Sequence, residues 1–151
     1  MDATDKRLLQ LLQEDAKTPI SRLAEALSLT KSPIYDRIRR FEREGLIDRY
    51  VAVLDPKISG AAIVVFCSVS LESQKLEAIN AFADAIKEIP EVMECYLMGG
   101  ASDFLIKVMV RDLNDYKEFS NSKLAALPNV AQIQSTFVLD TIKKSTVMPM
   151  Y

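Results

Sequence analysis

The rear part of this chain contains two stretches that follow the same order of sequence patterns. In each, an apolar run of strand type leads into a stretch with helical spacing, and a second strand-type run follows. Both helical stretches close on a hydrophobic residue, a proline, one further residue and a valine, at 89–92 and 127–130. Two such βαβ units interleave into a single sheet with both helices on one face, which is the ferredoxin-like arrangement. We therefore predict a βαββαβ domain over 61–151.

The first and third predicted strands, 62–71 and 103–110, are apolar on both sides. Because successive side chains point to opposite faces of a strand, some of them must lie away from the helices. These are Val64, Phe66, Leu105 and Met109. Burying each such side chain contributes roughly 1.5–3 kcal/mol before the costs of association. We expect a homodimer that pairs these faces, and the alternative is that the front part of the same chain covers them.

The front part of the chain, residues 1–54, carries helical patterning instead. Leucines at helical spacing predict one helix near the start and a second that follows Ser21. The turn at 27–30 then leads into a third helix over 30–44. Two short helices joined by so short a turn are typical of a helix-turn-helix. Ser28 stands where such a turn often has glycine, so either the turn differs or Ser28 takes a strained positive φ.

The third predicted helix has one apolar side and one basic side. Ile34, Ile38 and Phe41 form a single stripe at about 100° per residue. Arginines gather on the other side, although the whole chain has a formal net charge of -2. Basic outer faces are also common on solvated helices, where acidic residues three or four positions away pair with them. The three-helix order favours the other interpretation, in which this face enters the major groove of DNA.

Beyond the third helix, residues 46–55 show apolar residues at strand spacing. They could fold back as a wing, with Arg49 meeting a phosphate. The proline and glycine of 55–60 are typical of a connector. The predicted organisation is thus α+β: a winged helix-turn-helix domain at 1–54, a linker at 55–60, and the ferredoxin-like domain from 61 onward.

Composition excludes several kinds of enzyme. The chain has no histidine, which rules out Ser-His-Asp and Cys-His catalysis and the usual zinc sites. Its two cysteines, Cys67 and Cys95, lie in apolar runs and are expected to be buried free thiols. No apolar run approaches the roughly 20 residues that span a bilayer, and the first residues lack the order of a signal peptide. We expect a cytoplasmic protein that is not an enzyme and that needs no metal or cofactor.

A glycine pair, Gly99 and Gly100, separates the predicted strands at 89–98 and 103–110. In one interpretation a simple hairpin needs these glycines for their positive φ. In the other, the exposed backbone amides hold a carboxylate while the neighbouring Asp103 holds an ammonium group. The pattern alone leaves both open.

Taken together, these residues resemble the Lrp/AsnC family of transcriptional regulators, also called leucine-responsive, asparagine-responsive or feast/famine regulators. The resemblance is carried by DKRLLQLLQEDAKTPISRLAEALSLTKSPIYDRIRRFEREGLIDRY (5–50), MGGASDFLIKVMVRDLNDY (98–116) and LPNVAQIQSTFVLDTIK (127–143). It implies an N-terminal winged helix joined to a ferredoxin-like domain that dimerises and often assembles into octameric rings. Such proteins typically bind amino acids between dimers and regulate metabolic or transport genes.

The resemblance also implies roles for single residues. The family's recognition helix matches 30–44, and the expected DNA contacts are Lys31, Ser32, Tyr35, Asp36, Arg39, Arg40, Arg43 and Arg49, the last two as phosphate partners. The family's Gly-x-x-Asp effector loop matches 100–103, and its last-strand Ser/Thr positions also have counterparts. The expected effector site is Met98, Gly99, Gly100, Ser102, Asp103, Ser135 and Thr136. Ala101 occupies a position where many relatives carry an acidic residue, which leaves the identity of the effector open.

We therefore expect a sequence-specific DNA-binding transcriptional regulator whose assembly or DNA binding responds to a small molecule, an amino acid. Its expected partners are double-stranded DNA, that amino acid, and further copies of itself in a homodimer and an octamer. The alternative is an amino-acid-sensing module that binds a protein partner instead of DNA. A steep salt dependence of binding to duplex DNA distinguishes the two.

Overall fold

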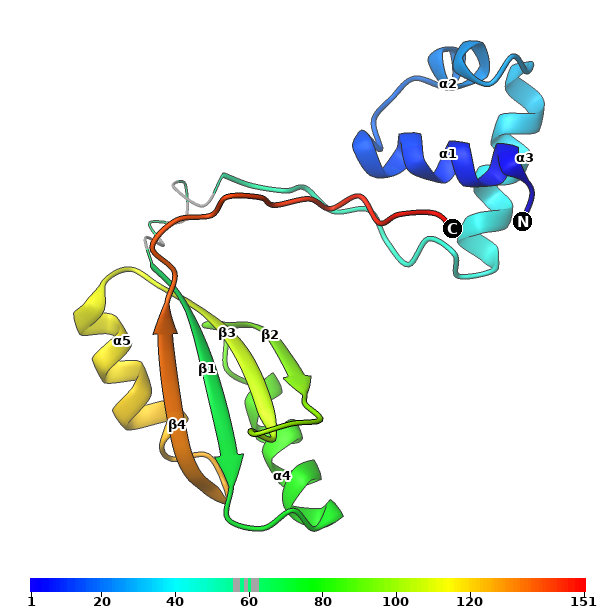
Figure 1. Ribbon diagram of the computed structural model, residues 1–151. Helices are drawn as coiled ribbons and strands as arrows, with labels where there is room; N and C mark the ends of the chain where they lie inside the picture. The colour runs from blue at the N-terminus through cyan, green and yellow to red at the C-terminus, as the bar shows by residue number, and fades with distance from the viewer. Residues whose placement is uncertain (56–57, 59, 61–62) are drawn as a thin grey trace. The chain divides into compact units, whose positions relative to one another are not determined.

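The computed structural model describes residues 1–55, 58, 60 and 63–151 (Figure 1). The chain forms two compact units, which we name unit 1 (Met1–Val53 with Ile142–Tyr151) and unit 2 (Leu54–Thr141). Residues 56, 57 and 59 of the predicted linker and residues 61 and 62 of the predicted rear domain lie outside the described residues. The segment Ile142–Tyr151, which the sequence assigned to the rear domain, belongs to the unit of the front helices.

Unit 1 contains three helices. They are α1 (Ala3–Glu14), α2 (Ile20–Ala26) and α3 (Lys31–Arg43). α1 begins with a capping box: the Asp2 side chain accepts a hydrogen bond from the Asp5 amide, and the Asp5 side chain accepts one from the Asp2 amide. Side chains at the start of α1 therefore satisfy backbone amides of its first turn.

The turn between α2 and α3 takes the strained form that the sequence left as one option. α2 begins at Ile20, ahead of the predicted cap at Ser21, because the Pro19 carbonyl already accepts the first hydrogen bonds of the helix. Ser28 then has a φ of 52°, in the left-handed region that favours glycine. The Leu29 amide donates to the Ala24 carbonyl at 2.9 Å, which closes the turn and releases the chain into α3.

The predicted apolar stripe of α3 is the centre of the core of unit 1. Ile34 and Phe41 are fully buried and Ile38 is partly buried. They pack with side chains from α1 and α2: Leu8, Leu9, Leu12, Leu23 and Ala24. Gly45 follows the helix with a φ of 70°, which ends it and turns the chain away. One side of α3 is thus buried in the core of unit 1, and the other side is exposed.

The predicted wing at 46–55 is not formed as a strand. In the described part of the chain this segment contains no strand and pairs with none. A strand needs a partner for its backbone groups, and no strand of unit 1 offers one. The segment is instead fastened to α3 by the Tyr50 hydroxyl, which donates to Glu42 Oε1 at 2.9 Å. Burial and this carboxylate raise the pKa of Tyr50 to about 12.

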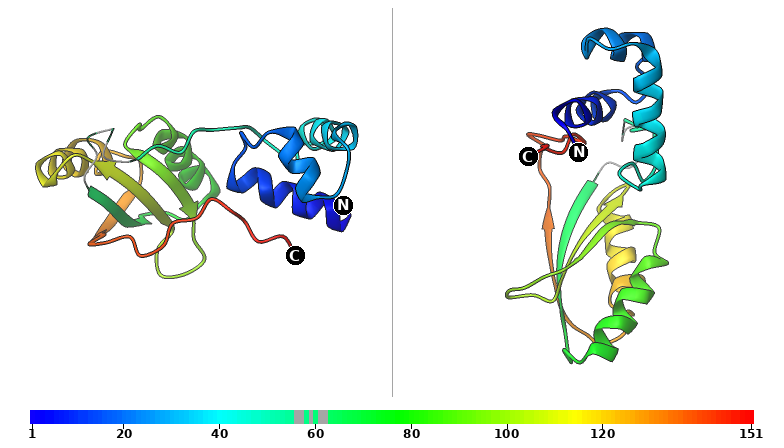
Figure 2. Two further views of the ribbon diagram at one scale, coloured as in Figure 1. Left: turned by 90° about the horizontal axis from the view of Figure 1, so that it is seen from above. Right: turned by 90° about the vertical axis from the view of Figure 1, so that its right-hand side faces the viewer.

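Unit 2 has the predicted ferredoxin-like arrangement. Its elements are β1 (Ile63–Leu71), α4 (Leu76–Lys87), β2 (Val92–Leu97), β3 (Phe104–Val110), α5 (Leu113–Phe119), the π-helix η2 (Ser120–Leu124) and β4 (Val130–Phe137). The strands pair antiparallel in the order β2-β3-β1-β4. Both α4 and α5 lie on one face of this sheet (Figure 1, Figure 2). The core fills the space between that face and the helices.

The π-helix adjusts the last helical segment to this core. Phe119 and Leu124 are both buried although they are five positions apart, a spacing that an α-helix would turn to different sides. The i→i+5 turn of η2, closed by the Ala125 amide and the Ser120 carbonyl at 2.9 Å, brings them to the same side.

The face of the sheet away from the helices is uncovered within unit 2. Val65 and Val69 of β1 are fully buried beneath the helices, whereas Val64 and Phe66 alternate with them and are only partly buried. Val64 is in register with Met109 of the neighbouring strand. The four apolar side chains predicted for an interface are Val64, Phe66, Leu105 and Met109, and they share this face. No described helix of unit 2 shields them.

Candidate functional site

The outer side of α3 presents most of the side chains predicted to meet DNA. Lys31, Ser32, Tyr35, Asp36 and Arg39 are exposed, and so is the side chain of Arg43 one turn further on. The helix forms an open concavity of about 650 Å³ that four arginines line against one aspartate. This surface is therefore strongly basic in a chain whose net charge is negative, and it suits a polyanion.

Two arginines of α3 are held by α1 and do not point freely to solvent. Asp5 is buried, with 1% exposure, and its Oδ2 lies 2.7 Å from Arg40 Nη2. Arg37 contacts the other oxygen of Asp5 and also lies 2.9 Å from Asp2 Oδ2. A buried carboxylate that accepts from two guanidinium groups fixes the angle between the helices that carry them. Arg37 and Arg40 thus tie the candidate reading helix to α1.

The electrostatics of this cluster favour the charged forms. Burial alone would raise the pKa of Asp5, but hydrogen bonds from the Asp2 amide, Arg40 and Arg37 outweigh it, so the pKa lies below its ordinary value. The Asp5 amide and then Arg37 lower the pKa of Asp2 in the same way. The hydrogen bonds that Arg37 makes to Asp2 and then to Asp5 raise the pKa of Arg37. The cluster is fully ionised at neutral pH.

Arg40 is further restrained by its surroundings. Its guanidinium lies 5.3 Å from the centroid of the Phe41 ring, a cation–π distance. Its Nε is buried and has no hydrogen-bond partner among the described residues, since Glu44 Oε2 is 4.0 Å away. Arg40 was predicted to contact DNA, but the structure directs its guanidinium toward Asp5. The clue that sequence reasoning missed is the Asp-x-x-Asp spacing at the start of α1.

Arg49 lies outside the helix, in the segment that follows α3. Its side chain is 79% exposed, and Asp48 Oδ2 is 3.5 Å from its Nε. An ion pair this exposed contributes little, so the guanidinium is free to exchange Asp48 for another anion.

The glycine-containing loop at 98–103 is anchored to the end of β1 by Asp103. Asp103 Oδ2 accepts from the Leu71 amide at 2.7 Å, and the Asp103 amide donates to the Val69 carbonyl at 3.0 Å. The Met98 amide donates to the Asp103 carbonyl at 2.8 Å, which closes the loop. Asp103 was predicted to hold an ammonium group, and one of its carboxylate oxygens already shapes the loop.

The two glycines of this loop have no internal reason to be glycine. Neither Gly99 nor Gly100 has a positive φ, which removes the argument for a simple hairpin turn. A Cβ built on either would meet no atom of the described chain within 4 Å. Bare backbone in open space is what a ligand or a second chain needs in order to approach closely.

The two predicted effector residues of the last strand point in opposite directions. Ser135 is in register with Cys67 and lies on the helix side, where its hydroxyl contacts the Tyr116 hydroxyl. Thr136 is in register with Phe66 and lies exposed on the uncovered face. Along β1, Phe66 is three residues from Val69 and five from Leu71, or about 10–17 Å from the two residues that anchor the loop. Within one chain, therefore, the structure does not bring Ser135 and Thr136 together with the loop.

Both cysteines are free. Cys67 is buried as predicted and Cys95 is partly buried. Burial raises the pKa of the Cys67 thiol, whose sulfur lies 3.3 Å from the Tyr116 hydroxyl. Cys67 therefore remains a thiol inside the core, which is a packing role.

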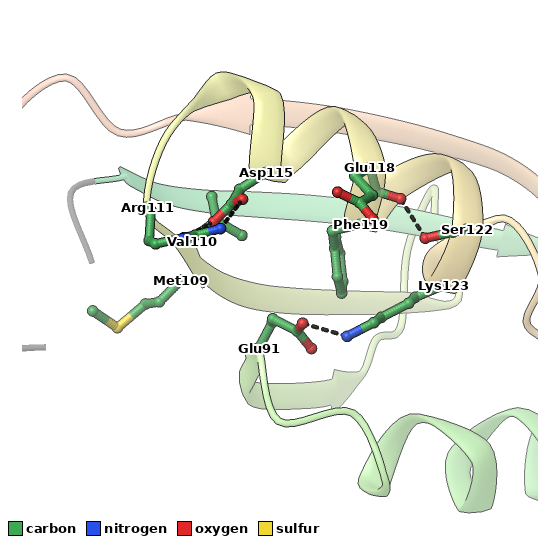
Figure 3. A pocket seen from close by; sticks show the side chains of 9 residues that line it. All are labelled: Glu91, Met109, Val110, Arg111, Asp115, Glu118, Phe119, Ser122 and Lys123. Atoms are coloured by element: carbon green, nitrogen blue, oxygen red, sulfur yellow. Dashed lines mark hydrogen bonds and ion pairs between the residues drawn. The ribbon is translucent and has the colours of Figure 1, made fainter. Parts of the chain in front are cut away.

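A separate hollow of about 430 Å³ lies at the C-terminal end of β3, against α5 and η2. Figure 3 shows the side chains that line it. Its charged side chains pair with one another: Arg111 Nη2 donates to Asp115 Oδ1 at 2.6 Å, and Lys123 contacts Glu91. It shares no residue with the predicted effector site. Because its cations already have partners, we assign no ligand to it.

Two classes of site receive no support from the described residues. Among residues 1–55, 58, 60 and 63–151, no group of three or more His, Cys, Asp or Glu side chains is arranged to hold a metal ion. In the same part of the chain, no helix combines the length and the apolar character needed to cross a membrane.

Comparison with known proteins gives the context of both units. Residues 1–42 match the model of the AsnC-type helix-turn-helix domain, and residues 64–148 match that of the Lrp/AsnC ligand binding domain. Together the two matches cover most of the chain.

Relatives and solved structures agree over almost the full length. The chain is 39% identical to the proline dehydrogenase transcriptional activator of Rhodobacter capsulatus, over 94% of this chain and 92% of that protein. It is 30% identical to the leucine-responsive regulatory protein of Escherichia coli, over 96% and 88% of the two chains. Its fold superposes with a TM-score of 0.93 on a transcriptional regulator of Neisseria meningitidis in complex with L-Met, at 32% identity and with 99% and 96% of the chains covered.

Proposed function

The chain belongs to the Lrp/AsnC family of DNA-binding transcriptional regulators, and we propose that it reads duplex DNA with α3 and answers to an amino acid held by unit 2. The family consists of regulators, not enzymes. The observation that carries the proposal is the exposed basic side of α3, opposite a side fixed in the core, within a matched helix-turn-helix domain. We propose a DNA-binding domain at 1–54 that the segment 142–151 joins, a linker at 55–60 and an effector domain from 61 to 141, in a protein that acts in the cytoplasm.

For DNA recognition we propose a division among the predicted residues. Side chains on the first two turns of α3 meet base edges: Lys31, Ser32, Tyr35, Asp36 and Arg39. Arg43 and Arg49, both highly exposed, meet phosphates. Arg40 contributes to the basic surface but acts mainly through its contact with Asp5. The exposed positions of the first group and the inward direction of Arg40 support this division.

For the effector we propose the loop at 98–103, with its bare glycine backbone facing the ligand. The L-Met complex of the Neisseria relative supports an amino acid as the class of ligand. Backbone amides at Gly99 and Gly100 and the Ser102 hydroxyl suit its carboxylate, and the remaining oxygen of Asp103 suits its ammonium group. Met98, whose own amide already donates to the Asp103 carbonyl, borders the site. Thr136 of a second copy of the chain completes the site, since within one chain Thr136 lies too far from the loop at 98–103.

For assembly we propose a homodimer through the uncovered sheet face, and an octamer built from such dimers. The aligned pair of Val64 and Met109 supports the first step, because partly buried apolar side chains without a cover favour association. The same face carries an ion pair between Lys107 Nζ and Glu94 Oε1 at 2.7 Å. The effector acts by binding one assembly state better than another, and its effect is limited to that difference in affinity.

One pair of experiments tests the proposal. Duplexes that bind the protein are first selected from a random pool, and the affinity for a selected duplex is then measured against salt concentration. Several phosphate contacts require log affinity to fall steeply with log salt. Molecular mass in solution, measured with and without a pool of the twenty amino acids, tests assembly and effector response together. A protein that selects no sequence contradicts the DNA role of α3, and one that binds no amino acid contradicts the effector role of the loop.

A further inference from the structure

An extended segment of the chain, 147–151, lies along the outer side of α1. The Gln13 side chain makes two hydrogen bonds to the backbone of Met148: its Oε1 accepts from the Met148 amide at 2.7 Å, and its Nε2 donates to the Met148 carbonyl at 3.4 Å. Toward the start of the helix, the Lys6 ammonium group donates to the Tyr151 backbone oxygen. Two side chains of α1 therefore hold both ends of the segment.

The spacing of these anchors fits the length of the segment. Lys6 and Gln13 lie on one side of α1, about 10.5 Å apart along an axis that rises about 1.5 Å per residue. From Met148 to Tyr151, an extended or polyproline-type chain covers about 9–11 Å. The two lengths agree, so the segment runs along the helix from Gln13 back toward Lys6.

The side chains of the segment follow a three-residue period. Val147 and Met150 are partly buried, whereas Met148 and Pro149 between them are exposed. Three residues per turn is the period of the polyproline II conformation, which Pro149 favours through its fixed φ. Met150 packs against the apolar cluster that joins α1 to α2 and α3. The segment thus adds a side chain to the core of unit 1.

Gln13 is well suited to hold such a segment. A polyproline-type chain has no internal hydrogen bonds, so its amides and carbonyls need outside partners. The side-chain amide of glutamine, like that of asparagine, carries a donor and an acceptor on neighbouring atoms. Gln13 uses both functions on a single residue, Met148, as a neighbouring strand would.

We propose that this side of α1 is a docking surface for residues 147–151 of the same chain, and that the docked segment stabilises the DNA-reading unit. α1 is the helix whose Asp5 holds Arg37 and Arg40 of α3, so the segment supports the helix that positions the arginines. The chain leaves unit 1 after Val53 and re-enters it at Ile142, only a few residues beyond β4. The docked segment therefore attaches unit 1 to the rest of the chain at a second point.

A crosslinking experiment tests which chain supplies the segment. Gln10→Cys on the same side of α1 is combined with Met148→Cys, which leaves Gln13 and the backbone of the segment intact. A short bis-maleimide should join the two cysteines within one chain, which changes the mobility of the monomer on a denaturing gel. The two single variants control for reaction at Cys67 and Cys95. A covalent dimer specific to the double variant would show that a second copy supplies the segment, and no specific crosslink would show that it does not dock; either result overturns the proposal.

A second measurement tests the anchor itself. In Gln13→Ala, the Met148 amide should exchange with deuterium at least about five-fold faster than in wild type, which corresponds to about 1 kcal/mol for the lost hydrogen bonding. Glu14→Ala, an exposed neighbour on α1, is the matched control and should leave that rate unchanged. Equal rates in all three proteins would remove Gln13 as the anchor and overturn the docking surface.

Discussion

Arg40 of α3 and Asp5 of α1 form an ion pair in which Nη2 and Oδ2 are 2.7 Å apart, and Asp5 is almost inaccessible to solvent. Arg37 occupies the other oxygen of the same carboxylate. The arginines of α3 therefore divide into two groups. Arg37 and Arg40 orient the helix against α1, whereas the side chains of Arg39 and Arg43 are exposed.

Replacing Asp5 by asparagine should destabilise the protein. Asp5→Asn removes the charge that two guanidinium groups share, and hydrogen bonds to charged groups contribute about 1.5–3 kcal/mol each. Because the arginines are partly exposed and regain water, we expect the free energy of unfolding to fall by about 2 kcal/mol. Urea unfolding followed by circular dichroism measures it. Asp36→Asn, on the exposed side of α3, is the control and should change stability by less than about 0.5 kcal/mol; equal stability of Asp5→Asn and wild type would contradict the role of the pair.

The contribution of Asp5 should be lost in acid. The folded protein holds the pKa of Asp5 below its ordinary value of 3.8, so the unfolded chain takes up the proton first as the pH falls. The contribution is fully present above about pH 5 and disappears as the pH falls through the folded pKa. Unfolding measured from about pH 6 down to about pH 3 should show the difference between wild type and Asp5→Asn shrinking. A difference that stays constant over this range would mean that another interaction is responsible.

The two groups of arginines should differ in their effect on the salt dependence of DNA binding. Arg39→Gln and Arg43→Gln each remove an exposed positive charge, and each phosphate contact that is lost lowers the slope of log affinity against log salt by about 0.9. Arg40→Gln should lower the slope by less than half as much, since the Arg40 charge is already neutralised by Asp5. Fluorescence anisotropy on a selected duplex at several salt concentrations measures the slopes. Equal losses for Arg39 and Arg40 would show that Arg40 leaves Asp5 to meet the DNA.

Removing the carboxylate of Asp103 should loosen the glycine loop and weaken effector binding. Asp103→Ala leaves the Leu71 amide without its acceptor, which costs about 1–2 kcal/mol of stability. We expect the affinity for the amino acid that wild type binds, identified by titration calorimetry against the twenty amino acids, to fall at least ten-fold, or about 1.4 kcal/mol. Glu72→Ala, an exposed change beside the same strand end, is the control. Unchanged binding of that amino acid by Asp103→Ala would remove Asp103 from the site.

A charge on the uncovered sheet face should prevent dimerisation. Phe66→Glu places a carboxylate at the centre of the proposed interface, where its desolvation costs several kcal/mol. Light scattering should then give the mass of a monomer in place of an oligomer. Leu76→Glu is the matched control, because Leu76 is 71% exposed at the start of α4 on the other side of the sheet. A Phe66→Glu protein that keeps the wild-type mass would place the interface elsewhere.

Much of this fold can be predicted from local patterns. The repeated proline closures at 89–92 and 127–130 predict the βαββαβ order because each marks the end of a helix before a strand. The stripe of Ile34, Ile38 and Phe41 predicts which side of α3 is buried, since helical geometry fixes the spacing. At Ser28 the sequence left two options, a different turn or a strained positive φ, and the structure has the second, with a φ of 52°.

Features that depend on contacts far apart in the sequence are not predicted. Asp5 and Arg40 look like ordinary surface charges until α1 and α3 cross, and Met150 has no local pattern that places it in the front core. The π-turn of η2 escapes detection because it breaks the period on which helix prediction rests. The wing at 46–55 fails for the opposite reason: its pattern suits a strand, but unit 1 provides no strand to pair with it.

The division of unit 1 between two distant parts of the chain has a consequence for proteolysis. The front helices and the segment Ile142–Tyr151 meet in one compact body, although unit 2 separates them in the sequence. A protease that nicked the chain once, just after Asp55, would produce two fragments. The hydrogen bonds of Gln13 and Lys6 to the segment would oppose separation of the two fragments. The nicked molecule should therefore migrate as a single species until a denaturant is added.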